Sequence, residues 1–227
     1  MLDTVLHAIL DFVGAHSALL TVLILIALGV GMVLCLTVQK RRFTVREIAV
    51  MGMLAALNIV LAEVCKITII PNALVLSFGF LPIAVCGMLF GVAPTVTVAV
   101  VADILGALLF SSGSFYFGYT LTAFLVGLFY ALFLHKRDLS LARCALCQLL
   151  VSIVCYALLN SIWALNWVTK TAAAEYIGTR LIMQPILYPY TCFSCCCCVN
   201  TANHWRGRCE NDGKQARDPA RIAGDLP

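Results

Sequence analysis

The stretch from Ser111 to Arg137 restricts the fold of this chain more than any other part of it. In order, it contains a Gly/Ser turn, four aromatic residues within five positions, an apolar run of membrane-spanning length, and a basic end at His135, Lys136 and Arg137. This order is typical of a transmembrane helix that begins at an aromatic-rich interface and ends in cytoplasmic positive charge. The aromatic cluster is larger than an interfacial anchor needs, which indicates that a flat, polar molecule docks there.

The composition indicates that most of the folded surface lies in lipid. Hydrophobic residues make up 62% of the chain, charged residues 11%, and the mean hydropathy is +0.99. Soluble domains average about 45–50% apolar and about 25% charged residues. Because backbone polar groups in lipid must pair within the protein, the spans are helices, and we predict an all-α integral membrane protein. The net charge is only +4, and no polar element contains a basic patch, so no nucleic-acid partner is expected.

The apolar runs predict a six-helix core preceded by one extra transmembrane helix. We expect the extra helix at about 17–37, the core spans at about 48–64, 78–90, 94–110, 119–134 and 141–163, and a sixth span that starts near 176. The acidic residues Asp3 and Asp11 and the absence of an A-x-A site favour a retained helix over a cleaved signal peptide. The corresponding regions are 1–42 (extra helix and basic linker), 43–190 (core) and 191–227 (an atypical end).

Two basic clusters orient the spans. One cluster contains Lys40, Arg41, Arg42 and Arg46, and the other extends from His135 to Arg143. Positive charge accumulates in cytoplasmic loops, so both clusters are expected inside the cell. The loops at 63–77, 111–118 and 165–175 then lie outside, and the short turn at 91–93 lies inside.

The end of the chain differs from the rest. It is polar from about residue 201, and it contains four consecutive cysteines at 195–198. One hypothesis is a shifted reading frame after about Tyr190, because leucine codons CTG read one base out of frame give the cysteine codon TGC. The alternative is a genuine Cys-rich helix end with a polar tail. Elsewhere, Cys144 and Cys147 form a C-x2-C pair, but they lie in the first turns of an apolar span, where free cysteines are small apolar residues, so neither a metal site nor a disulfide is expected.

Polar residues inside apolar spans are costly and usually functional. Asp103 lies seven residues before Phe110, which is about 10 Å below the outer end of its span. It is interpreted either as a ligand contact or as a buried hydrogen bond between helices. The predicted topology gathers further polar and aromatic side chains at the same outer end: Asn58, Glu63, Phe117, Tyr119, Asn160, Trp163, Arg180 and Gln184. We predict an outward-facing pocket for a flat heteroaromatic ligand with a carboxylate.

Each of these residues also has a structural interpretation. Trp163 could belong to an aromatic belt, Arg180 could extend to lipid headgroups, and Glu63 could be interfacial. Small residues at four-residue spacing predict close helix packing at Gly87-x3-Gly91, Gly52-x3-Ala56 and Ala123-x3-Gly127-x3-Ala131. No phosphate-binding loop, H-E-x-x-H or G-x-S-x-G motif occurs, so we expect neither an enzyme nor a cofactor.

The core resembles the folate-family substrate-binding (S) components of energy-coupling factor (ECF) vitamin transporters. The resemblance is carried by FGFLPIA with A-D-x-x-G-A, by F-G-Y-T-L-T-A at the start of the fourth core span, and by L-L-N-S-I-W and T-R-L in the last two spans. It extends over about 43–190. The extra N-terminal helix and the end after Tyr190 depart from the family pattern.

The resemblance implies a six-span protein of the bacterial cell membrane that captures folate or a reduced folate from outside. It adds Phe80 to the expected pocket, and it places Gly52 and Ala56 against a membrane coupling protein that works with two ATPase subunits. It further implies that the domain topples in the membrane to release the vitamin. The alternatives are an S component for another vitamin (a queuosine precursor, thiamine or pantothenate), or a membrane enzyme or scaffold without a transport role.

Overall fold

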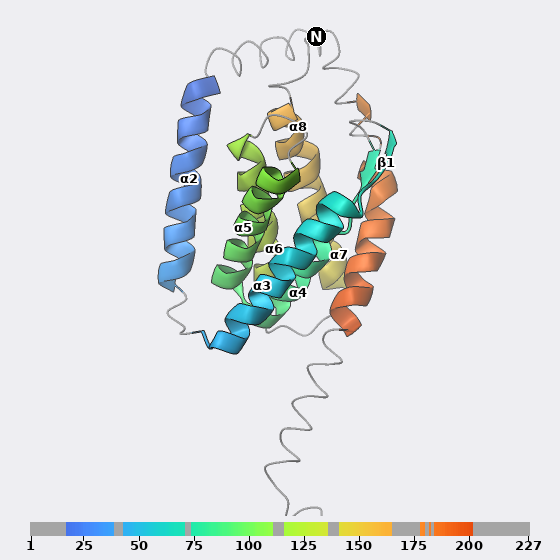
Figure 1. Cartoon of the computed structure of the whole chain (residues 1–227). Helices are drawn as coiled ribbons and strands as arrows, with labels where there is room; N and C mark the ends of the chain where they lie inside the picture. The colour runs from blue at the N-terminus through green and yellow to red at the C-terminus, as the bar shows by residue number, and fades with distance from the viewer. Residues whose placement is uncertain are drawn as a thin grey trace, which may run out of the picture.

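The computed structural model describes residues 17–38, 43–70, 74–110, 116–135, 141–164, 178–179, 182 and 184–201. These residues form a bundle of helices with one small hairpin at its upper end (Figure 1). In chain order the elements are α2 (Ser17–Val38), α3 (Val45–Ile59), the π-helical η1 (Val60–Val64), β1 (Ile67–Ile70), β2 (Leu74–Leu76), α4 (Phe80–Phe90), α5 (Val92–Phe110), α6 (Phe117–Leu134), α7 (Leu141–Leu150), the π-helical η2 (Val151–Leu159) and α8 (Asn160–Ala164). A last helix covers residues 184–201.

The predicted class of an all-α membrane protein is confirmed. Five described helical stretches are long and apolar enough to cross a membrane: Leu19–Thr37, Val45–Val64, Val92–Phe110, Phe117–Leu134 and Ala142–Trp163. The span expected at 78–90 is shorter, because α4 begins only at Phe80. The expected outer loop at 63–77 contains the antiparallel β1–β2 hairpin, which pairs Ile67 with Leu76 and Thr68 with Val75. This hairpin differs from the irregular loop that the sequence predicts between the two spans.

Helices α5 and α6 form the centre of the bundle, and small residues let their backbones approach. A methyl group added at Gly127 would lie 3.2 Å from Ala99 Cβ and 3.3 Å from Thr95 O. At the α4–α6 crossing, a methyl group at Gly87 would lie 3.0 Å from Ala131 N. The close packing predicted at Gly87 and Gly127 is therefore confirmed. In contrast, a methyl group at Gly52 would find no atom within 4 Å.

The turn between α4 and α5 consists of one residue rather than the expected three. Gly91 has φ +86°, a left-handed conformation that side chains disfavour, and its N–H donates to Gly87 O at 3.3 Å. A methyl group at Gly91 would lie 3.1 Å from the ring of His135, which follows α6. The turn and the end of α6 therefore meet at one end of the bundle. Arg46 and Arg143 lie at the starts of α3 and α7, and the positive-inside rule assigns this end to the cytoplasm.

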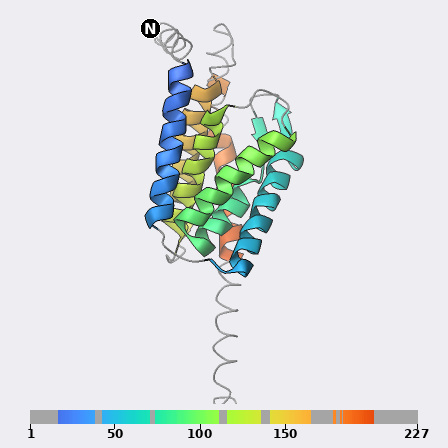
Figure 2. The same ribbon diagram turned by 60° about the vertical axis from the view of Figure 1, so that its left-hand side comes forward.

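The extra N-terminal helix α2 packs along one side of the core. Figure 2 shows it against α5 and α6, where Leu28, Met32 and Cys35 contact a cluster that includes Phe124. Gly31 fits against the Phe124 ring, since a methyl group there would lie 2.8 Å from Cζ. The opposite face of α2 exposes leucine, isoleucine and valine side chains, as expected for a surface in lipid.

The last helix continues through the Cys-rich tract. Cys195, Cys196 and Val199 are buried in the main core cluster together with Tyr130 and Cys144. The cysteines act there as small apolar residues, which suits their strong tendency to be buried. Both interpretations of the chain beyond Tyr190 stay predictions, as do the proposed region boundaries.

Candidate functional site

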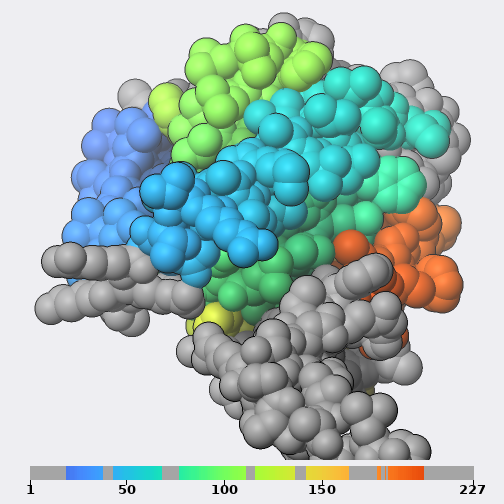
Figure 3. All heavy atoms as spheres, turned by 60° about the horizontal axis from the view of Figure 1, so that its bottom comes forward, coloured from blue at the N-terminus to red at the C-terminus, as the bar shows by residue number. Residues whose placement is uncertain are grey.

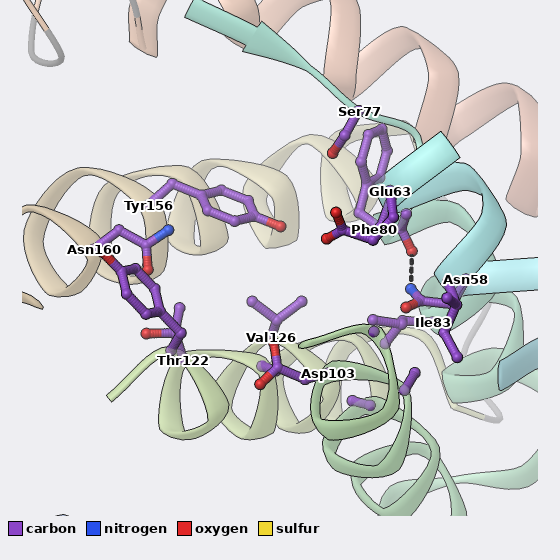
Figure 4. A pocket seen from close by; sticks show the side chains of 18 residues that line it. Asn58, Glu63, Ser77, Phe80, Ile83, Asp103, Thr122, Val126, Tyr156 and Asn160 are labelled. Carbon is purple, nitrogen blue, oxygen red and sulfur yellow. Dashed lines mark hydrogen bonds between the residues drawn. The ribbon is translucent and has the colours of Figure 1, made fainter. Parts of the chain in front are cut away.

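A cavity of about 190 Å³ lies in the outer half of the bundle, the half opposite Gly91. Side chains from several elements point toward a common space in Figure 4. The lining residues are Asn58, Ile59, Ala62, Glu63, Ser77, Gly79, Phe80, Ile83, Ala99, Ala102, Asp103, Gly106, Tyr119, Thr122, Ala123, Val126, Tyr156 and Asn160. The cavity exists because the residues of α5 and α6 that face it are mostly small. The polar lining residues provide it with hydrogen-bonding groups.

Asn58 and Glu63 form the wall that belongs to α3 and η1. The Asn58 side chain is buried, and its Nδ2 donates to Gly79 O, which ties α3 to the start of α4. Glu63 accepts a 2.7 Å hydrogen bond from Lys66 Nζ, and 30% of its side chain is exposed. The wider π-helical turn of η1 brings Ala62 and Glu63 to the cavity; such turns often occur at functional sites.

One of the two roles suggested for Asp103, a hydrogen bond between helices, is observed, and its contact with a ligand stays a prediction. Asp103 lines the cavity, and its Oδ2 accepts a 2.8 Å hydrogen bond from Thr120 Oγ1 of α6. A carboxylate can accept about four hydrogen bonds. Asp103 therefore joins α5 to α6 and retains acceptor capacity for a ligand.

Asn160 is the first residue of α8, and its amide oxygen is the clearest unused polar group of the site. Its Oδ1 is buried and has no hydrogen-bond partner among the described residues. Leaving such a group unpaired costs about 1–3 kcal/mol, so native proteins rarely do so without a reason. Tyr156 lies one helical turn earlier, in η2, and lines the same wall.

Trp163 supports the cavity wall from behind and is not a lining residue. It is 7% exposed, and its Nε1 donates a 3.0 Å hydrogen bond to Thr122 Oγ1, whose side chain does line the cavity. Its ring lies 5.8 Å from that of Tyr116, and a methyl group at Gly118 would collide with both rings. Gly118, which lies within the aromatic cluster, therefore allows Trp163 to pack onto α6.

Six of the residues expected in the pocket line the cavity: Asn58, Glu63, Phe80, Asp103, Tyr119 and Asn160. The structure does not place Phe117, Trp163 or Gln184 in this lining, and Arg180 lies outside the described residues. Ser77, Thr122 and Tyr156 also line the cavity and are not among the residues expected in the pocket. The spacing of Tyr156 nevertheless places it on the same face as Asn160, one turn earlier.

The fold and the cavity define a multi-pass membrane protein with a buried polar binding site near one membrane surface. Residues 46–195 match the family model of the substrate-specific component of ECF transporters, and the chain belongs to this family. It is a family of transporter components, not of enzymes. The chain is therefore a transporter component, and its apolar helices agree with a place in the membrane.

The chain is also similar to two curated proteins and to one solved structure. The chain is 32% identical over 114 residues to the folate transporter FolT of Clostridium novyi, and this alignment covers 50% of the chain and 66% of that relative. It is 30% identical over 152 residues to FolT of Leuconostoc mesenteroides, covering 63% of the chain and 79% of that relative. A crystal structure of FolT bound with folic acid matches at 30% identity with a TM-score of 0.61, covering 67% of this chain and 91% of that one.

Proposed function

We propose that this chain captures folate, or a reduced folate, from outside the cell and delivers it to an ECF importer. The observation that carries the proposal is the buried amide oxygen of Asn160, which has no partner among the described residues and lies in a cavity that Asp103 also lines. The names of the similar proteins, which refer to folate, support this choice of vitamin.

The chemistry of the cavity suits the pterin end of folate. The amino-pyrimidine edge of a pterin presents neighbouring N–H donors, which a carboxylate and an amide oxygen can accept. Asp103 and Asn160 supply these acceptors, and Phe80, Tyr119 and Tyr156 supply aromatic walls. Glu63 and Asn58 complete the polar lining on the α3 side.

The size of the cavity limits how much of the ligand it encloses. Its volume of about 190 Å³ lies below the range of about 300–1,000 Å³ that is usual for sites of drug-sized ligands. We therefore place the pterin in the cavity and the aminobenzoyl-glutamate arm toward the outer surface. Arg180, by its position in the sequence, is proposed to bind a carboxylate of the glutamate or the ring oxygen, and Gln184 to lie one turn further along the same face.

The proposed partners are a membrane coupling protein and two ATPase subunits. This chain has no phosphate-binding loop of its own, so ATP hydrolysis has to come from other subunits. Gly52 and Ala56 are exposed one turn apart on α3 and are proposed to contact the coupling protein.

Mass spectrometry of small molecules that co-purify with the full chain is the direct test. We expect a folate, and we expect titration calorimetry of ligand-free protein to rank folic acid above thiamine, pantothenate and a queuosine precursor. A stronger response to one of these other vitamins would keep the transport role and overturn the choice of ligand. The absence of any bound vitamin, together with no association with an ECF module, would favour an enzyme or a scaffold.

A further inference from the structure

One cation of this chain lies at the rim of the outer cavity, at the end of the bundle where positive charge is least expected. Among the described residues the lysines and arginines are Arg46, Lys66 and Arg143. Arg46 and Arg143 lie in the first turns of α3 and α7, at the inner end, which Figure 3 turns toward the viewer with α3 in cyan. Lys66 follows η1 at the opposite end. Because positive charge in membrane proteins accumulates on the cytoplasmic side, a lysine at the outer end calls for a reason.

The backbone beside Lys66 is held in place. The π-helical turn η1 ends with a 3.0 Å hydrogen bond from Cys65 N to Val60 O, and β1 begins directly after Lys66. The other end of the hairpin returns to the same turn, because Phe78 N donates to Leu61 O at 3.4 Å. Lys66 therefore has a fixed position beside the cavity, and only its side chain has to move to reach a ligand.

Charge changes sign along the cavity, from the inside to the rim. Asp103 is the deeper of the two lining carboxylates, which Figure 4 labels. Glu63 crosses α5 near Gly106, where a methyl group would lie 3.8 Å from Glu63 Cγ. Gly106 is three residues closer to the outer end than Asp103, which is about 4.5 Å along the helix. Lys66 Nζ donates to Glu63 Oε2 at 2.7 Å, from the connection to the β1–β2 hairpin. The order is therefore two carboxylates and then an ammonium group.

The ion pair with Glu63 leaves Lys66 available to a ligand. The Lys66 side chain is 39% exposed and that of Glu63 is 30% exposed. Ion pairs that water reaches contribute little to stability, so moving the ammonium group from Glu63 to another anion costs little. An ammonium group also has three N–H donors, and among the described residues only Glu63 accepts from Lys66. Lys66 can therefore bind a second carboxylate without first breaking a strong contact.

We propose that Lys66 determines specificity by binding a carboxylate at the anionic end of the ligand, which fixes the direction in which the ligand lies. This inference rests on the proposed capture of a folate. The carboxylates of Asp103 and Glu63 accept hydrogen bonds from the N–H groups of the pterin and repel an anion, whereas the ammonium group at the rim attracts the glutamate end. That end has two carboxylates, so the role of Lys66 is independent of the one proposed for Arg180.

Titration calorimetry of the full chain in detergent tests this role with two ligands that differ only in the charge of the tail. They are folic acid and its diamide, in which both glutamate carboxyl groups are primary amides. We expect the unaltered chain to bind folic acid more tightly than the diamide. Lys66→Met should lower the ratio of these two affinities about threefold to fivefold, the upper effect of one exposed ion pair. An unchanged ratio would overturn the proposal.

Two control variants keep either the charge or the site. Lys66→Arg retains the positive charge at the rim and should retain most of the preference for folic acid. Arg46→Met removes one positive charge at the inner end and should leave the ratio unchanged. A ratio that fell equally in Arg46→Met and Lys66→Met would show that the net charge of the chain, and not a contact with Lys66, sets the preference. The affinity of each variant for the diamide shows whether its pocket is intact.

A double variant separates a contact with the ligand from an effect through Glu63. Lys66→Met alone leaves the Glu63 carboxylate without its ion-pair partner, and that carboxylate would itself repel the glutamate end. Glu63→Gln combined with Lys66→Met removes both charges, and the ratio should stay low. A ratio that returned to the value of the unaltered chain would overturn the proposal, because Lys66 would then act only on Glu63.

The unaltered chain distinguishes this inference from the proposed function on which it rests. Equal affinity for folic acid and the diamide would overturn the role of Lys66 and leave the capture of folate intact. Binding of neither ligand would overturn the capture of folate itself, and the role of Lys66 with it.

Discussion

The amide oxygen of Asn160 provides the sharpest test at the scale of single residues. Because this oxygen is buried without a partner among the described residues, Asn160→Leu removes none of its hydrogen bonds within that part of the ligand-free protein. The melting temperature should stay the same or rise, whereas folate affinity should fall at least about fivefold, since a ligand bond worth about 1–3 kcal/mol is lost. Titration calorimetry and thermal unfolding of the same preparations measure both effects.

Asn58 is the matched comparison for Asn160. Its Nδ2 donates to Gly79 O within the protein, so Asn58→Leu should lower both the melting temperature and the folate affinity. A large loss of stability in Asn160→Leu with unchanged affinity would contradict the assignment of Asn160 to the ligand.

Trp163 should act on the ligand through Thr122. Trp163→Phe keeps an aromatic ring but removes the N–H that donates to Thr122 Oγ1 at 3.0 Å. We expect Trp163→Phe and Thr122→Val each to weaken folate binding, and the double variant to be no weaker than the worse single one, because both changes remove the same bond. Calorimetric binding constants for the four proteins give this coupling directly.

Two results would count against this arrangement. Additive losses in the double variant would indicate that Trp163 contacts the ligand by itself, as the sequence interpretation had expected. Thr122→Ser keeps the hydroxyl and should bind folate nearly as well as the unaltered protein. A loss as large as that of Thr122→Val would show that the hydroxyl is not the important group.

Among the elements, the α5–α6 crossing links stability to the binding site. Gly127→Leu forces a side chain against Ala99 and the α5 backbone, where even a methyl group lies at 3.2–3.3 Å. Overpacking of this kind costs about 1–3 kcal/mol, and it should also separate Asp103 of α5 from Thr120 of α6. We therefore expect both a lower melting temperature and weaker folate binding.

The control for this prediction is Gly29→Leu in α2, where a methyl group would meet no atom within 4 Å. The same substitution there should leave both measurements unchanged. Equal effects of Gly127→Leu and Gly29→Leu would show that the close approach of α5 and α6 does not determine the melting temperature or the folate affinity.

Sequence patterns predicted most of the helices because hydrocarbon length and charge determine where a span begins and ends. They did not predict η1 and η2, since a π-helical turn depends on packing with neighbouring helices rather than on composition. The β1–β2 hairpin had a detectable signal. Its β-branched and apolar runs flank Pro71-Asn72, a typical turn pair, but the loop was interpreted only by its position between spans.

The candidate site was predictable where a polar residue interrupts an apolar span, as at Asp103 and Asn160. Trp163 shows the limit of this reasoning. A tryptophan near a membrane surface can face a ligand, the lipid or a buried partner, and sequence spacing cannot distinguish them. The distinction comes from its bond to Thr122, which depends on the tertiary contact between α8 and α6.

For the whole molecule, two faces of a single helix separate ligand capture from the proposed coupling surface. α3 contributes Asn58 to the cavity through its buried face, while Gly52 and Ala56, six and two residues earlier, lie on its exposed face. A partner helix that packs closely against α3 needs small residues there. This arrangement would allow one rigid helix to contact both the ligand and the coupling protein.

This arrangement leads to a prediction that separates binding from coupling. Gly52→Leu combined with Ala56→Leu adds bulk to the exposed face of α3, and a methyl group at Gly52 would meet no atom of the described residues within 4 Å. We expect folate to raise the melting temperature of this variant and of the unaltered protein by the same amount. Co-purification with the coupling protein and its ATPases should be lost, because the two helices can no longer approach. Gly29→Leu, an equally unobstructed glycine on α2, should retain the complex, and its loss there too would place the coupling surface elsewhere.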